Sequence, residues 1–200
     1  MPGSPYFVLD YFTNPLVPDP EVGPFLEIHE EDVSVDGADA WQTGDRFDAE
    51  IATPIEIEAT PHHGYTGPPH DYFDGAIAFM SPRLVEVLRA EGVDNLDLYA
   101  AVITYRTTGE RHPVFAFNLI GLVAAVDTKR SKLSSADGDN TIDTGIAGFA
   151  VDLAKAGDRR LFRLAENSLT VLAHARIKDA IRAAGIDTFA FVEPEHWTQL

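Results

Sequence analysis

The sequence has no cysteine among its 200 residues. This absence excludes disulfide bonds, a thiolate nucleophile and a zinc site with cysteine ligands. No apolar run approaches the length that a membrane-spanning helix needs. The first ten residues, MPGSPYFVLD, lack the basic and apolar regions of a secretory signal. We therefore expect a cytoplasmic protein.

Basic residues are scarce in the first third of the chain. Residues 1–60 hold 14 of the 32 acidic residues and a single base, Arg46, and the whole chain has a formal net charge of −17. Charge of this sign disfavours nucleic acids and anionic membranes as partners. It favours association with a cationic partner, unless the acids form only a solvated surface.

The hydrophobic pattern predicts a single α+β domain over residues 1–200. Residues 1–70 form an acidic region broken by proline and glycine, and residues 71–200 are typical of a core of strands and helices. We expect two amphipathic helices, SPRLVEVLRAEG with Ser81 as N-cap and HARIKDAIRAAG, packed on one mixed or antiparallel sheet.

The strands of this sheet are expected from short apolar segments. Residues 96–126 predict a β-hairpin. Pro54 predicts that the strand containing Ile55 and Ile57 lies at a sheet edge. The other expected strands are GAIAFM, GIAGFAVDLA, RLFRLA, LTVLA and TFAFVEP.

The two helical units match each other at a constant offset of 93 residues. Nine positions correspond, from Arg83 and Arg176 to Asp94 and Asp187. Each copy has a strand, an amphipathic helix, a glycine, an aliphatic-Asp pair and another strand. Either the two helices share only the residue pattern that is common to amphipathic helices ending in glycine, or the two units are related and pack on one sheet. We favour the first explanation.

Residues 60–73, TPHHGYTGPPHDYF, bring together the residue types of a catalytic metal site. His62 and His63 are adjacent, as are His70 and Asp71, so the members of each pair point to opposite sides of an extended chain. The intervening proline and glycine residues give no recognisable metal-binding spacing. We expect an exposed connecting loop docked by its aromatic residues, with no metal or other cofactor.

Motifs for other catalytic chemistry are also missing. The sequence has no G-x-S-x-G nucleophile motif, no phosphate-binding P-loop and no G-x-G-x-x-G fingerprint. The segment DGDNTID resembles a calcium loop only superficially, because its glycine is misplaced and no glutamate closes the loop. These absences favour a binding protein over an enzyme.

Three segments resemble a known family: DYFDGAIAFMSPRLVEVLRAEG, LDLYAAVITYRTTGERHPVFAFNLIGLVAAVD and LFRLAENSLTVLAHARIKDAIRAAGIDTFAFVEP. They are similar to the MXAN-type bacterial polymorphic-toxin immunity proteins, and Leu161, Phe162 and Arg163 are the most telling residues. The resemblance implies a non-enzymatic inhibitor that binds and neutralises a cognate toxin domain. It implies no active-site residues.

An acidic surface can fill the basic cleft of a toxin by mimicking the phosphates of its substrate. The candidate contact residues are Glu27, Glu30, Glu31, Asp32, Asp36, Asp39, Trp41 and Asp45, with Trp41 as an aromatic anchor. Alternatively, the acids form a solvated face and Trp41 belongs to the core. Two other functions stay open: a metal-assisted hydrolase with a site at residues 62–71, and a structural module without a toxin partner.

Overall fold

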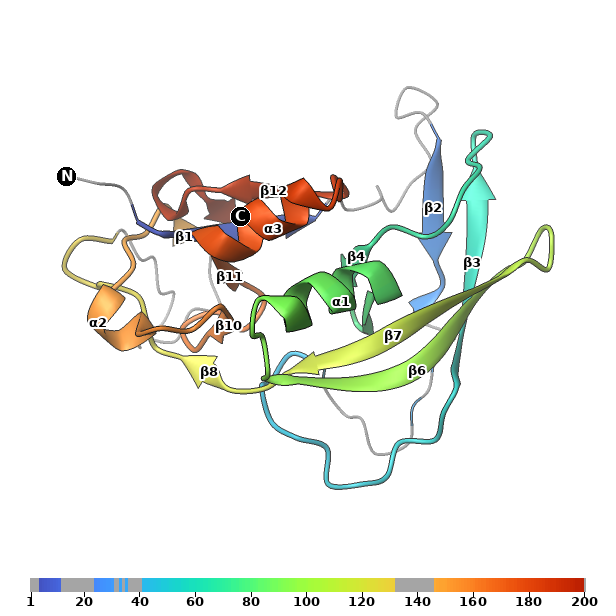
Figure 1. The fold of residues 1–200 in the computed structure, drawn as a ribbon, viewed down its shortest axis with the longest axis horizontal. Helices are drawn as coiled ribbons and strands as arrows, with labels where there is room; N and C mark the ends of the chain where they lie inside the picture. Colours follow the sequence, from blue (N-terminus) through green and yellow to red (C-terminus); the bar gives the residue numbers. More distant parts are fainter. Residues whose placement is uncertain are drawn as a thin grey trace.

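A computed structural model describes residues 4–11, 24–30, 33, 35, 41–131 and 146–199. In this part of the chain, two large sheets and three α-helices form an α+β fold. The expectation of one sheet is therefore wrong. Figure 1 shows the long strands of the six-stranded sheet on the right and the five-stranded sheet on the left.

The six-stranded sheet has the order β2-β3-β6-β7-β5-β4. Its strands are β2 (Phe25–Ile28), β3 (Ile55–His62), β4 (Tyr72–Asp74), β5 (Ala78–Met80), β6 (Leu96–Tyr105) and β7 (Arg111–Leu119). Strands β6 and β7 confirm the predicted hairpin over residues 96–119, and their pairing runs from Leu96–Leu119 to Thr104–Arg111. The rest of the predicted range, residues 120–126, lies outside the hairpin and includes a strand of the other large sheet. Neighbouring strands are antiparallel except β3 and β6, which run parallel.

The prediction that β3 is an edge strand is wrong, because β3 lies between β2 and β6. Pro54 stands just before the strand, so its missing N–H does not interrupt the ladder that starts at Ile55. The alternation along β3 is regular: Ile55 and Ile57 are buried, whereas Glu56 and Glu58 are exposed. This pattern fixes which face of β3 points into the protein.

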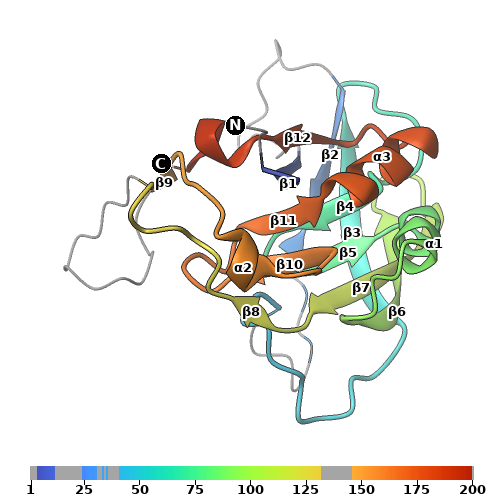
Figure 2. The same cartoon turned by 60° about the vertical axis from the view of Figure 1, so that its left-hand side comes forward.

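The five-stranded sheet has the order β12-β1-β11-β10-β8. Its strands are β1 (Tyr6–Tyr11), β8 (Leu122–Val123), β10 (Leu161–Leu164), β11 (Val171–His174) and β12 (Phe189–Val192). Strand β1 lies between β11 and β12 and is antiparallel to both (Figure 2). The acidic first part of the chain thus supplies an inner strand to each large sheet.

Smaller elements complete the C-terminal part of the fold. They are β9 (Ile146–Ala147), α2 (Leu153–Ala156), the 3-10 helix η2 (Pro194–His196) and β13 (Thr198–Gln199). Helix α2 corrects the prediction of a strand throughout GIAGFAVDLA. Asp152 starts this helix, because its side chain accepts hydrogen bonds from the N–H groups of Ala154 and Lys155.

The two predicted amphipathic helices are confirmed as α1 (Pro82–Ala90) and α3 (Ala175–Ala183). Ser81 caps α1 by accepting a hydrogen bond from the N–H of Leu84, and His174 caps α3 in a similar way. The two helices contact each other and lie side by side in Figures 1 and 2. Each helix buries one apolar stripe on the same central cluster.

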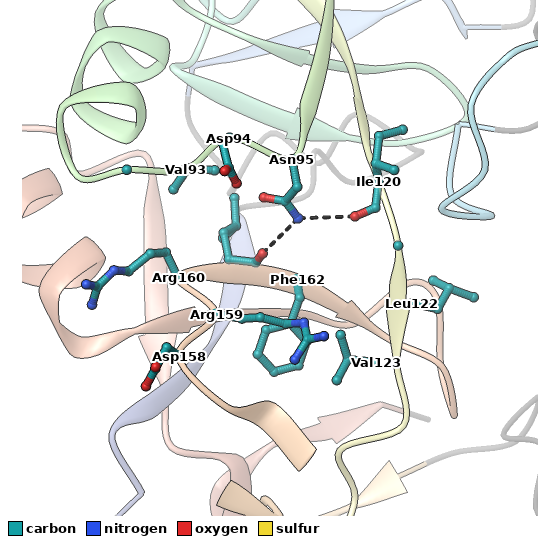
Figure 3. A pocket seen from close by; sticks show the side chains of 13 residues that line it. Val93, Asp94, Asn95, Ile120, Leu122, Val123, Asp158, Arg159, Arg160 and Phe162 are labelled. Atoms are coloured by element: carbon teal, nitrogen blue, oxygen red, sulfur yellow. Dashed lines mark hydrogen bonds between the residues drawn. The ribbon is translucent and has the colours of Figure 1, made fainter. Parts of the chain in front are cut away.

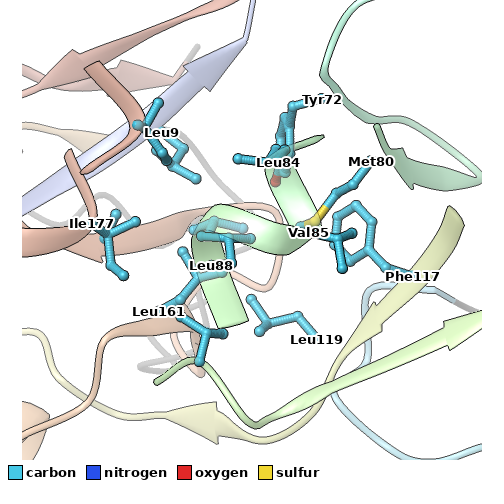
Figure 4. Close-up of a cluster of buried hydrophobic side chains, with 14 of the residues drawn as sticks. Leu9, Tyr72, Met80, Leu84, Val85, Leu88, Phe117, Leu119, Leu161 and Ile177 are labelled. Carbon is cyan, nitrogen blue, oxygen red and sulfur yellow. The ribbon is translucent and has the colours of Figure 1, made fainter. Parts of the chain in front are cut away.

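Alternate residues of the strands divide the core into a central cluster and two outer clusters. The central cluster lies beneath α1 and α3 and joins the two large sheets (Figure 4). One outer cluster covers the opposite face of the six-stranded sheet, and the other covers the opposite face of the five-stranded sheet. A buried ion pair also joins the sheets: Arg163 of β10 donates to Asp74 of β4 at 2.8 Å.

Candidate partner-binding surface

The structure places the eight predicted contact residues in different situations. Glu27 lies in β2, Glu30 lies just after it, and Trp41 and Asp45 lie in the loop that leads to β3. The remaining four lie outside the described residues: Glu31, Asp32, Asp36 and Asp39. The structure therefore tests the predicted surface only at the first four of these residues.

Trp41 belongs to the core of the six-stranded sheet and is only 5% exposed. Its ring lies edge-on to that of Phe47, with centroids 4.9 Å apart, and edge-on to Tyr99 of β6 at 5.7 Å. Such edge-to-face packing adds to the stabilisation that burial provides. The structure therefore favours the core interpretation of Trp41: its ring holds residues 41–54 on their own protein.

Hydrogen bonds also hold the same segment, which we call the acidic loop (residues 41–54). Asn118 of β7 is fully buried, and its Nδ2 donates to the carbonyl oxygen of Asp45 at 2.5 Å. Gln42 donates its Nε2 to the carbonyl oxygen of Gly75 at 2.7 Å. Because the loop is held by both apolar and polar contacts, its outer side chains project from a rigid support.

Three carboxylates project from the acidic loop. Asp45, Asp48 and Glu50 are exposed, and no carboxylate of these three has a hydrogen bond or ion pair within the described part of the chain. Arg46 is the one base of residues 1–60, and it is paired with Asp97 of β6 at 2.5 Å. The loop thus presents negative charge that the described cations leave unneutralised.

Asp48 and Glu50 were absent from the predicted contact residues. A signal for them exists in the segment DRFDAEI, where Phe47 and Ile51 alternate with acids. Phe47 is half-buried and Ile51 is buried, and both pack in the outer cluster of the six-stranded sheet, whereas the acids beside them are exposed. The packed apolar residues on either side of Asp48 and Glu50 therefore indicate that these two carboxylates are held in place.

The other two described acids make contacts within the protein. Glu30 accepts hydrogen bonds from the backbone N–H groups of Ala76 and Ile77, so it fixes the turn before β5. Glu27 pairs with His62, with Oε2 and Nε2 2.7 Å apart. Phe25 stacks on the imidazole of His62, with ring centroids 4.8 Å apart. Glu27 thus links β2 to β3, and both acids are less available to a partner than those of the acidic loop.

The histidines and aspartate of residues 60–73 have different partners. His62 contacts Glu27, whereas Asp71 accepts hydrogen bonds from Ser81 at 2.5 Å and from Arg83 at 2.6 Å. His70 lies edge-on to Tyr65, and burial lowers the pKa of His70 despite the opposing charges of nearby carboxylates.

Among the described residues, only Glu193, Glu195 and His196 are close enough together to hold one metal ion. All three are exposed, and we assign them no role because exposed acidic groups are common in a chain of this charge.

Tyrosine hydroxyl groups dock the loop that follows β3. Tyr105 of β6 donates to the carbonyl oxygen of Gly67 at 2.8 Å, and Tyr65 donates to that of Pro68 at 2.6 Å. Burial raises the pKa of Tyr105, so its hydroxyl remains protonated and stays a donor. Loop residues such as His63 remain exposed beside β2.

A cavity of about 550 Å³ lies where β6, β8 and β10 begin (Figure 3). Asn95 bridges its two sides, because its Nδ2 donates to the carbonyl oxygens of Ile120 at 3.2 Å and Leu161 at 3.1 Å. Arg159 also lines the cavity and donates to the carbonyl oxygen of Ala156 at 3.1 Å. These polar groups hold segments of the protein together, and we assign the cavity no ligand.

The fold and the surface define an acidic α+β protein that holds a charged loop on one sheet by apolar contacts and hydrogen bonds. The chain belongs to the immunity protein family Imm11, whose family model matches residues 17–195. Family membership indicates a role in toxin immunity. A comparison with curated proteins finds no match. Within the described residues, no helix has both the length and the apolar character that crossing a membrane requires.

Proposed function

We propose that the protein binds a cognate polymorphic-toxin domain and neutralises it without catalysing a reaction. The family match is the observation that carries this proposal, because it covers residues 17–195. The contact surface is the acidic loop. The exposed carboxylates of Asp45, Asp48 and Glu50, held on a rigid support, favour this surface over the paired acids Glu27 and Glu30.

The charge of the loop suits a toxin with a basic cleft. Carboxylates can occupy the positions of substrate phosphates, and a net charge of −17 attracts a cationic partner over a distance. Electrostatic attraction of this kind raises the association rate and the selectivity more than it raises affinity. A loop that is ordered before binding also loses less conformational entropy in the complex.

The first test is co-expression with the toxin domain encoded by the neighbouring gene. We expect the protein to restore growth of cells that express the toxin and to co-purify with it. The proposed function is contradicted if the protein neither protects the cells nor binds the toxin. This outcome does not depend on which surface of the protein makes the contact.

The second test concerns the surface. The triple variant Asp45→Lys, Asp48→Lys and Glu50→Lys should lower the association rate by roughly 10- to 1,000-fold and weaken its salt dependence. The matched control is Glu86→Lys, Asp94→Lys and Asp179→Lys, which makes the same charge change at exposed acids elsewhere. Equal effects of both variants would assign the attraction to overall charge and contradict the role of the acidic loop.

A further inference from the structure

The match between the two helical units extends to the bounds of their elements. Strand β5 occupies residues 78–80 and β11 begins at residue 171, α1 and α3 occupy residues 82–90 and 175–183, and β6 and β12 begin at residues 96 and 189. Each corresponding pair is 93 residues apart. The units lie in different sheets, so they do not pack together on one sheet.

The ends of the two helices are also the same in detail. Gly92 and Gly185 have φ angles of 81° and 69°, which favour glycine, and each donates its N–H to the third residue before it at 3.0 Å. Val93 and Ile186 donate to Leu88 and Ile181, at 3.0 and 3.2 Å. Unrelated helices often end in the same kind of glycine cap, so the caps do not decide whether the units are related.

The strands before the helices pair in the same register in both units. Met80 of β5 lies opposite Tyr72 of β4, and the corresponding Ala173 of β11 lies opposite Leu161 of β10. The next two pairs along each hairpin correspond in the same way, so β4 and β10 match at a constant offset of 89 residues. The sequence preferences of a helix do not determine the register of a neighbouring hairpin.

The strand between the hairpin and the last strand gives the strongest correspondence. In the first unit this place is taken by β7, and in the second unit by β1 from the other end of the chain. Every shared pair gives the same offset of 108 residues. For example, Phe117 of β7 lies opposite Leu98 of β6, and Leu9 of β1 lies opposite Phe191 of β12. The closing strands are therefore equivalent although they lie at opposite positions in the sequence.

The central cluster consists largely of equivalent residues from the two units. One corresponding pair is Met80 with Ala173. Figure 4 labels two more, Leu84 with Ile177 and Phe117 with Leu9. Asp74 and Arg163 are also equivalent positions, and they form the buried ion pair between the units. Equivalent residues that meet each other define a two-fold axis, as in an interface between two identical subunits.

We infer that the chain contains two copies of one hairpin–helix–strand unit, related by a two-fold axis through the central cluster. The central cluster is a self-complementary interface, and the partner that it fits is a second copy of the same unit within the chain. In a tandem pair, the closing strand of the second unit would follow β12. Here β1 fills that place from the N-terminal end, which corresponds to a circular permutation.

The test exchanges residues between equivalent positions of the full chain. Met80→Ala leaves a cavity, and Ala173→Met overpacks the same cluster from the other unit. The double variant Met80→Ala/Ala173→Met should have a higher urea midpoint than the lower of its two single variants. The control Met80→Ala/Ala116→Met places methionine at a buried alanine of the outer cluster, where we expect no such recovery.

A second exchange keeps the inference testable if Ala173→Met alone does not fold. Leu9→Phe/Phe117→Leu exchanges the equivalent residues of β1 and β7, and both belong to the central cluster. The control Val8→Phe/Phe117→Leu puts phenylalanine on the opposite face of β1, in the other outer cluster. A recovery of the urea midpoint in the equivalent pairs, but not in their controls, supports the two-fold relation. The two-fold relation is overturned if the urea midpoints of both equivalent double variants are no higher than those of their controls.

Discussion

The two large sheets share one central cluster but differ in what covers their opposite faces. The six-stranded sheet is covered by long connecting segments, including the acidic loop with Trp41 and Ile51. The five-stranded sheet is covered by residues around α2, including Phe149 and Ala156, and by Trp197 from the end of the chain. The two large sheets therefore share a core but carry different surfaces on their opposite faces.

The two covers also differ in how several of their acidic side chains are held. On the six-stranded sheet the cover presents exposed carboxylates between apolar anchors. On the five-stranded sheet, Asp152 of the cover caps α2 and has Lys155 as a neighbour at 3.8 Å. The central cluster and the apolar anchors stabilise the fold. The exposed carboxylates between those anchors make the proposed contact with the toxin.

The largest effect is expected from breaking the contact between the two large sheets. Arg163→Met leaves the carboxylate of Asp74 buried without its cation, because the two side chains are 0% and 4% exposed. We expect the free energy of unfolding to fall by about 3–5 kcal/mol, measured by urea denaturation.

The matched control for this change is the double variant Asp74→Leu/Arg163→Met. It removes the isolated charge together with its partner, so it should be more stable than Arg163→Met alone. A loss of less than about 1 kcal/mol in Arg163→Met would show that the pair does not hold the two sheets together.

The next effect concerns the cover of the six-stranded sheet. Trp41→Ala removes a buried ring that packs on Phe47 and Tyr99, and it should cost about 3–5 kcal/mol, at or just below the effect of Arg163→Met. Hydrogen exchange should accelerate most in residues 41–54, because the ring anchors that loop. The variant should also bind the toxin more weakly, since the carboxylates lose their support.

Leu153→Ala is the control on the other sheet. Leu153 lies in α2 and is 50% exposed, so its truncation should change stability by less than about 0.5 kcal/mol. Unchanged exchange in the acidic loop of Trp41→Ala would contradict the anchoring role of the ring.

Local signals predicted the two amphipathic helices, α1 and α3, but not the short helix α2 or the arrangement of the sheets. Ser81 lies one residue before α1, Pro82 is its first residue, and Gly92 lies two residues after its end. The place of β1 depends on pairing such as that of Val8 with Leu172, and no local pattern encodes a partner so distant in the sequence. Position in a sheet is a tertiary property, as the inner location of β3 also shows.

The candidate surface was predictable in charge but not in burial. The excess of acids in the first third is evident from composition. Which acids are free depends on hydrogen bonds such as those of Glu30 with Ala76 and Ile77, and these residues are far apart in the sequence. The sequence left Trp41 open between a partner anchor and a core residue, and its contact with Tyr99 favours the core.

The helix caps allow a finer comparison of the two units. Ser81 accepts from the N–H of Leu84 and donates to Asp71, whereas His174 accepts only from the N–H of Arg176 at 3.2 Å. Ser81→Ala should cost about 1–2 kcal/mol, and His174→Phe, which keeps a ring beside Tyr6, about 0.5 kcal/mol. Urea midpoints measure both. A larger loss in His174→Phe would reverse the ranking of the caps.

The smallest effect is a difference in pH dependence between His70, in the loop before β4, and His174, at the end of β11. Burial lowers the pKa of His70, and burial followed by the charges of Arg160 and Arg176 lowers that of His174, both from 6.5. The folded state therefore binds fewer protons than the unfolded state near this pH, so stability is lost as pH falls through this range.

The variant His70→Gln should lose less stability than the parent between pH 7.5 and pH 5.5, measured as the shift in urea midpoint. His174→Gln should also lose less, but its difference from the parent should shrink with added salt because part of the pKa shift comes from arginine charges. The effect of His70→Gln should persist in salt, because burial is its main cause. Identical pH dependence in His70→Gln and the parent would show that His70 is not held neutral by the fold.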